Sequence, residues 1–100
     1  MEFANQNILI TGAADGLGLA VSKAFAKQKA NLFLIDVNYK KLIQNNISNS
    51  NNIECDLSNI NSVKNLINKF KVENIYIDIL IHNAAVLVPK SFEETTSDYW

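Results

Sequence analysis

This 100-residue chain has one cysteine, one proline and no large excess of positive or negative charge. The single cysteine and the balanced charge each exclude a class of protein. The single cysteine, Cys55, cannot form an internal disulfide, and nothing around it marks a reactive thiol, so we expect a buried strand residue. A net charge of −1 leaves no basic field for nucleic acid or anionic lipid. Because neither a cationic secretory start nor a membrane-length apolar run is present, we expect a cytoplasmic protein.

What the chain does contain is enough apolar material for a folded core, since 48% of its residues are hydrophobic and 19% are charged. Apolar runs alternate with helix-patterned segments, an order typical of βαβ units and a parallel sheet. We expect strands at residues 7–11, 32–35, 53–56 and 75–81. Helices are expected from about Leu17, over 39–47 and after a Ser58 cap, with a surface loop over the asparagine-rich residues 48–52.

The helical patterns also predict which side chains face the core. In the first helix, Ser22, Lys23 and Lys27 are expected on the solvent side, opposite an apolar face of Leu17, Ala20, Val21, Ala24 and Phe25. The third helix carries one apolar stripe, expected to be core: Ile60, Val63, Leu66, Ile67 and Phe70. Beyond the last strand, a loop is expected over 86–92 and a further helix from about Thr95.

All three glycines, Gly12, Gly16 and Gly18, fall in one eight-residue stretch that begins at Thr11. The stretch follows the apolar run 8–10 directly and precedes a helical pattern directly. Glycine is favoured where the backbone needs a positive φ or must approach a ligand closely. A turn of this kind presents the first N–H groups of a helix to an anion, and a pyrophosphate is its natural occupant.

An acidic residue, Asp36, follows eighteen positions after Gly18, at the end of the second expected strand. In a dinucleotide fold, a carboxylate at this place accepts hydrogen bonds from the adenosine ribose hydroxyls. Alone, the glycines could mark an ordinary strand-to-helix turn, and Asp36 could be a turn residue or a helix cap. Together and in this order they favour dinucleotide binding.

Four features now stand in sequence: Thr11-Gly12-x-x-x-Gly16-x-Gly18, Asp36, Cys55-Asp56-Leu57, and His82-Asn83-Ala84-Ala85. The set resembles the classical short-chain dehydrogenases/reductases over essentially the whole chain. The extended branch of that family, which includes epimerases, typically has the spacing T-G-x-x-G-x-x-G, which is absent here. The resemblance implies an α/β fold, a partial Rossmann-type doubly wound parallel sheet of about four strands in the order 3-2-1-4.

The resemblance also implies roles for individual residues. Gly12, Gly16, Leu17 and Gly18 would line the pyrophosphate and nicotinamide side of the turn. Asp36 would bind the ribose, and Asp56 with the backbone of Leu57 would contact the adenine. Asn83, Ala84 and Ala85 match the latter part of the family's N-N-A-G motif, which stabilises the central sheet and passes beneath the cofactor. His82 and Ala85 depart from that motif, and a Cβ at position 85 could crowd the cofactor.

His82 is itself expected to be a hydrogen-bonded strand-end residue and not a metal ligand, since no second ligand type clusters with it.

Charge near the adenosine end favours NAD over NADP as the cofactor. A 2′-phosphate would meet the Asp36 carboxylate, and the residue before Gly16 is another acid, Asp15. Lys40 and Lys41 lie nearby in the sequence but are expected on the solvated face of the next helix.

The residues for the family's chemistry are absent from this sequence. The family uses a downstream serine and a Tyr-x-x-x-Lys pair, in which the lysine lowers the tyrosine pKa. No such pair occurs here, and Ser91 has no base near it in the sequence. We therefore expect residues 1–100 to be the N-terminal part of a single dinucleotide-binding domain, truncated before its catalytic half. Alone, it should bind weakly and catalyse nothing.

Two alternatives stay open. The chain could be a non-catalytic module that uses the nucleotide crevice or the apolar sheet edge at 75–81, through which it could also oligomerise. It could equally be a non-functional gene fragment. The sequence does not identify the substrate beyond the small alcohol or carbonyl compound that the family resemblance implies for a full-length form.

Overall fold

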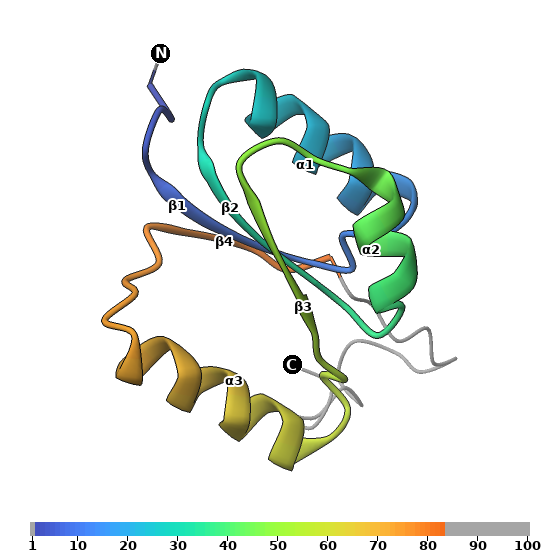
Figure 1. Cartoon of the computed structure of the whole chain (residues 1–100), viewed down its shortest axis with the longest axis vertical. Helices are drawn as coiled ribbons and strands as arrows, with labels where there is room; N and C mark the ends of the chain where they lie inside the picture. The colour runs from blue at the N-terminus through green and yellow to red at the C-terminus, as the bar shows by residue number, and fades with distance from the viewer. Residues whose placement is uncertain (1, 84–100) are drawn as a thin grey trace, which may run out of the picture.

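The computed structural model describes residues 2–83. Its four strands form one parallel sheet in the order β3-β2-β1-β4 (Figure 1), which confirms the predicted partial Rossmann fold. The expected loop at 86–92 and the helix from Thr95 lie outside the described residues. The elements are β1 (Asn7–Thr11), α1 (Gly16–Lys27), β2 (Asn31–Asp36), α2 (Tyr39–Asn45), β3 (Ser50–Glu54), α3 (Ile60–Val72) and β4 (Ile79–Ile81).

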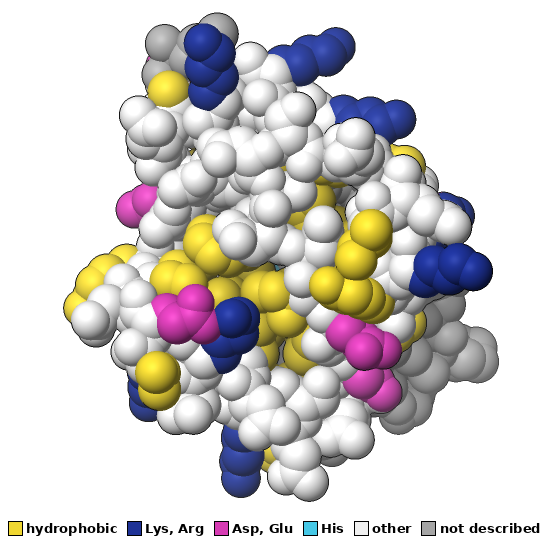
Figure 2. Space-filling view, in the orientation of Figure 1, with side chains coloured by type: hydrophobic (Ala, Val, Ile, Leu, Met, Phe, Trp, Pro, Cys, Tyr) yellow, Lys and Arg dark blue, Asp and Glu magenta, His cyan; other side chains and the backbone are white. Residues whose placement is uncertain are grey.

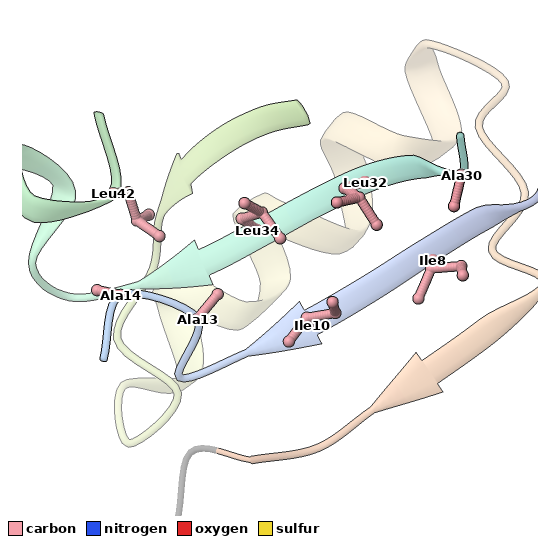
Figure 3. Packing of buried hydrophobic residues seen from close by; sticks show 8 residues of the cluster. All are labelled: Ile8, Ile10, Ala13, Ala14, Ala30, Leu32, Leu34 and Leu42. Carbon is pink, nitrogen blue, oxygen red and sulfur yellow. The ribbon is translucent and has the colours of Figure 1, made fainter. Parts of the chain in front are cut away.

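The main core lies on the sheet face that α1 and α2 cover. Successive strand residues point to opposite faces, so β1 and β2 each send alternate side chains into this core. Figure 3 shows how the two central strands, the turn after β1 and helix α2 contribute to it. Its buried members are Ile8, Ile10, Ala13, Ala14, Ala30, Leu32, Leu34 and Leu42.

Helix α3 covers the opposite face, as Figure 1 shows. Phe33 of β2 meets Phe70 of α3 edge to face, with ring centroids 5.5 Å apart. Ile35, Cys55 and Leu66 form the buried centre of this second cluster. The prediction that Cys55 is buried is confirmed, although the residue lies just after β3 and not inside it.

The second face is only partly covered within residues 2–83. Leu80 of β4 pairs with Leu9 of the neighbouring strand but is 61% exposed, and Ile67 of α3 is 50% exposed. Figure 2 shows hydrophobic side chains gathered in a hollow at the middle of this side of the molecule, with charged side chains around it. The sheet therefore presents apolar surface beside α3.

Two strands differ from their predicted bounds. β3 begins at Ser50, inside the stretch that we expected to be a surface loop, because it pairs with β2 along its whole length as an outer strand that tolerates polar side chains. β4 is shorter than expected. Just before it, Asp78 and Asn7 are joined by a backbone hydrogen bond of 2.8 Å and by a bond of 2.7 Å from the N–H of Asn7 to the Asp78 carboxylate, while the Asn7 side chain donates to the carbonyl of Tyr76 at 2.8 Å.

The helices also correct four predictions. Ser22 lies on the core side of α1, with 0% exposure, and donates to the carbonyl of Gly18 at 2.7 Å. Asn59 and not Ser58 caps α3, since its side chain accepts the first free N–H groups of that helix. α2 ends at Asn45, two residues earlier than expected. Five expected core side chains are exposed: Leu17, Ala20, Ala24, Ile60 and Ile67.

No helix in the described part of the chain is long and apolar enough to cross a bilayer.

Candidate functional site

The carboxyl ends of the parallel strands meet at one edge of the sheet, where ligands of such folds bind. The glycine turn leads there from β1 into α1. Gly12 and Gly16 both have a positive φ, of 61° and 51°, which is the conformation that favours glycine. Asp15 is the residue before α1, but its side chain makes no capping hydrogen bond. The start of α1 therefore has no side-chain cap from Asp15 to compete with an incoming anion.

The second and third glycines of the turn have different environments. A Cβ added to Gly16 would meet no atom within 4 Å, so the space beside this residue is open. A Cβ added to Gly18 would overlap the carbonyl oxygen of Gly12 and lie 2.7 Å from the side-chain nitrogen of Asn83. Gly18 thus permits close packing of α1 against the turn and the end of β4, whereas Gly16 borders open space.

Asp36, at the end of β2, organises the loops on both sides of this edge. Its Oδ2 accepts the backbone N–H of Ala14 in the glycine turn at 3.0 Å, and its Oδ1 accepts the N–H of Asn38 at 3.0 Å. A carboxylate can accept about four hydrogen bonds, so about two positions stay available for other donors such as ribose hydroxyls. The side chain that was expected to bind the ribose therefore also fixes the glycine turn.

Helix α2 is tied to the glycine turn by side chains one helical turn apart. Asn45 donates to the carbonyl of Ala14 at 3.0 Å, and Lys41 forms an ion pair with Asp15. Lys40 is exposed and 40% of the Lys41 side chain is accessible, in line with the expected solvated face, but the ion pair of Lys41 was not predicted. No local sequence signal identifies Asn45, because the contact spans 31 positions.

Asp56 follows β3 at the same edge of the sheet and is exposed. Its Oδ1 accepts the hydroxyl of Ser58 at 2.6 Å and the N–H of that residue at 2.9 Å. These two bonds, the hydroxyl first, lower the pKa of the Asp56 carboxyl, with a small opposing effect from burial. Its own N–H donates to Ser62 at 3.0 Å, so the loop is fixed to α3. Leu57 is half-buried and packs against the second cluster.

The ends of β1 and β4 are joined through the buried Thr11, a residue to which sequence analysis gave no separate role. Its hydroxyl accepts the N–H of Asn83 at 2.7 Å and lies 3.1 Å from Nδ1 of His82. The prediction that His82 is a hydrogen-bonded strand-end residue is confirmed. The only feature of the sequence that could have indicated this role of Thr11 is its place directly before Gly12 in the T-G pattern. Ala84 and Ala85 lie outside the described residues, as does Ser91.

This edge of the sheet therefore brings together the first N–H groups of α1 beside the open space at Gly16, the carboxylate of Asp36 and the side-chain amide of Asn83. Such groups can hold a phosphate and a ribose. Within residues 2–83, no group of three or more His, Cys, Asp or Glu side chains could hold a metal ion.

Comparison with known proteins agrees with this geometry. The family model for short chain dehydrogenase matches residues 6–100. Similar proteins include the chloroplastic protochlorophyllide reductase of Pisum sativum, 34% identical over 94 residues that cover 87% of this chain and 24% of that protein. An uncharacterised oxidoreductase of Bacillus subtilis is 34% identical over 88 residues, covering 82% of this chain and 32% of its own.

A third similar protein is the meso-2,3-butanediol dehydrogenase of Serratia marcescens, 30% identical over 106 aligned positions, with 100% of this chain and 41% of that protein covered. The chain thus spans between about a quarter and two-fifths of the length of these curated relatives.

Proposed function

The chain belongs to the short-chain dehydrogenase family, and from this membership we propose that it is the dinucleotide-binding part of an oxidoreductase. In its complete form, such a protein transfers a hydride between a nicotinamide cofactor and an alcohol or carbonyl substrate. The observation that carries the proposal is the position of Asp36. Its carboxylate fixes the glycine turn and the start of α2 and retains acceptor capacity toward the edge where a ribose would lie.

In this proposal the turn and the start of α1 bind the pyrophosphate. The open space at Gly16 admits it, and backbone N–H groups with the helix dipole favour its charge. Leu17, whose side chain is 69% exposed, lies at the first turn of α1 and borders the nicotinamide side. The remaining roles are Asp36 on the ribose, Asp56 and Leu57 on the adenine, and Asn83, Ala84 and Ala85 beneath the cofactor.

We propose NAD as the preferred cofactor over NADP. A 2′-phosphate would place two negative charges against the Asp36 carboxylate, with Asp15 on the neighbouring turn. This preference rests on charge alone and is independent of the substrate.

The proposal places the catalytic groups outside residues 1–100. The serine and the Tyr-x-x-x-Lys pair of the family are absent from this sequence, so we place them in a following segment of the same domain. On this view residues 1–100 bind the cofactor and do not transfer hydride alone. A coding sequence that continues past Trp100 with these residues would support the assignment, whereas a message that ends at Trp100 would contradict it.

Calorimetric titration of the purified chain with NAD and with NADP tests the binding site, after circular dichroism has shown that the chain is folded. We expect saturable NAD binding. Gly16→Val, which fills the open space, should abolish it, and Asp36→Ala should weaken it about tenfold or more, because hydrogen bonds to a charged group are lost. Lys69→Ala on the exposed side of α3 is the control and should bind as the unaltered chain does.

A folded chain that binds no dinucleotide, or binds it unaffected by both substitutions, would refute the proposal. One observation favours a second candidate, a non-catalytic interaction module: β4 is an outer strand of the described sheet, and its Leu80 is exposed. Self-association that depends on Leu80, without nucleotide binding, would support that candidate instead.

A further inference from the structure

The ion pair between Asp15 and Lys41 spans the mouth of the adenosine end of the proposed site. Asp15 precedes α1 on the glycine turn, and Lys41 lies in the first turn of α2. The two residues are 26 positions apart, and no other ion pair in residues 2–83 links two elements of the fold.

The backbone around this pair places it next to the ribose-binding carboxylate. Asp36 accepts one hydrogen bond from Ala14, the neighbour of Asp15, and one from Asn38, which caps the helix that carries Lys41. Asn45 anchors α2 on the turn at the same time. The contacts of Asp36, Asn45 and the ion pair therefore fix α2 against the turn that leads into α1, and Asp36 bonds to both segments.

The supply of cations at this end of the site is small. The chain contains no arginine, and all nine of its basic residues are lysines. Lys40 and Lys41 are the two that open α2 beside Asp36. Of these, Lys40 is exposed and without a described ion pair, and Lys41 is turned toward the site but is neutralised by Asp15.

We propose that Asp15 sets the selectivity for the adenosine ribose by engaging Lys41, an inference that rests on the proposed dinucleotide site. With the pair formed, a 2′-phosphate meets Asp15 and Asp36, and the ammonium group of Lys41 is already engaged by Asp15. With Asp15 neutral, Lys41 is free to pair with that phosphate. The chain therefore discriminates against 2′-phosphorylated ligands because Asp15 engages the ammonium group of Lys41, and not because a cation is missing from this end of the site.

Both side chains of the pair are partly exposed, with 40% and 68% of their surfaces accessible. Solvent screening keeps such pairs weak, so the selectivity that this pair supplies is modest in size. Neutralising Asp15 removes one repulsive charge and releases one attractive charge. We expect a change of about 5-fold to 30-fold in relative affinity, largest at low ionic strength.

The test uses two ligands that differ only in the 2′-phosphate, 5′-AMP and 2′,5′-ADP, titrated calorimetrically into the full chain at low salt. Asp15→Asn keeps the size of the side chain, and it removes no helix cap because Asp15 makes none. It should lower the ratio of the dissociation constants, 2′,5′-ADP over 5′-AMP, by about tenfold. Adding Lys41→Met to Asp15→Asn should reverse most of that change.

Lys40→Met in the same Asp15→Asn background is the matched control and should leave the gain intact, because its side chain does not reach Asp15. Circular dichroism checks that each variant is folded. If Asp15→Asn leaves the ratio unchanged while 5′-AMP binding still depends on Asp36, the selectivity inference is overturned and the proposed function stands. The inference is also overturned if the Lys41 change does not reverse the gain. If 5′-AMP binds to no folded variant, the proposed function fails as well.

Discussion

Gly18→Ala should separate the packing role of this glycine from the conformational role of its neighbour Gly16. A Cβ at position 18 would overlap the backbone oxygen of Gly12 and press on the side chain of Asn83, 2.7 Å away. Backbone cannot rotate away as a flexible side chain can, so the glycine turn and α1 must move apart. Gly16→Ala meets open space and suffers only from its φ of 51°.

The magnitudes differ accordingly. A left-handed conformation costs a non-glycine residue about 1–2 kcal/mol, and the stiffer unfolded chain returns about 0.4–1 kcal/mol, so Gly16→Ala should lower the free energy of unfolding by about 0.5–1 kcal/mol. Overpacking costs about 3 kcal/mol when backbone must shift, and alanine returns about 1 kcal/mol of helix propensity inside α1. The net loss for Gly18→Ala is then about 2 kcal/mol or more.

Thermal unfolding followed by circular dichroism measures both variants. For a domain of this size, 1 kcal/mol shifts the Tm by about 4–8 °C. We therefore expect Gly18→Ala to lower the Tm by about 10–15 °C and Gly16→Ala by about 5 °C or less. If the two variants unfold within about 2 °C of each other, the close approach of α1 to the turn is not what requires glycine at position 18.

Three further changes give measurable outcomes. Thr11→Val leaves the buried N–H partner at the end of β4 unsatisfied and should cost about 1–3 kcal/mol in urea unfolding, whereas Thr11→Ser, which keeps the hydroxyl, should cost less. Phe70→Ala removes the edge-to-face contact of α3 with the sheet and should cost about 2–3 kcal/mol, against less than about 0.5 kcal/mol for the exposed Val72→Ala. Ser58→Ala removes the main cause of the lowered Asp56 pKa, which should rise toward its usual value in an NMR titration. Because the folded pKa is lowered, the associated stability exists above the unfolded pKa and is lost as the pH falls through the folded value, and this acid dependence should weaken in the variant.

The positions of the strands and of the glycine turn could be predicted from the sequence because their signals are local, whereas the strand order followed from the family resemblance. Hydrophobic runs mark the buried strands, and the glycine spacing marks the turn. Asp36 is another such case, since its place at a strand end and its distance from the glycines are visible without a structure. These features do not depend on which distant residues become neighbours.

The features that were not predicted depend on residues that are distant in the sequence and adjacent in the fold. β3 is formed by asparagines with little strand propensity, because the edge of β2 offers them a complete set of partners. Ser22 breaks the apolar face of α1, yet its hydroxyl is satisfied by a carbonyl one turn earlier, so it can be buried. Lys41 is a surface lysine by every local criterion, and only the approach of α2 to the turn brings it to Asp15.

The central position of β1 has a consequence for the order of events during synthesis. Of the described strands, β1 leaves the ribosome first and β2 follows soon after, but the partner on the other side of β1 is β4, with Ile8 beside Ile79. The 71 positions between them take on the order of 4–14 s to translate at ordinary rates. Throughout that interval the nascent chain exposes one edge of β1, so a ribosome pause before β4 would prolong the period in which this chain is most open to mispairing.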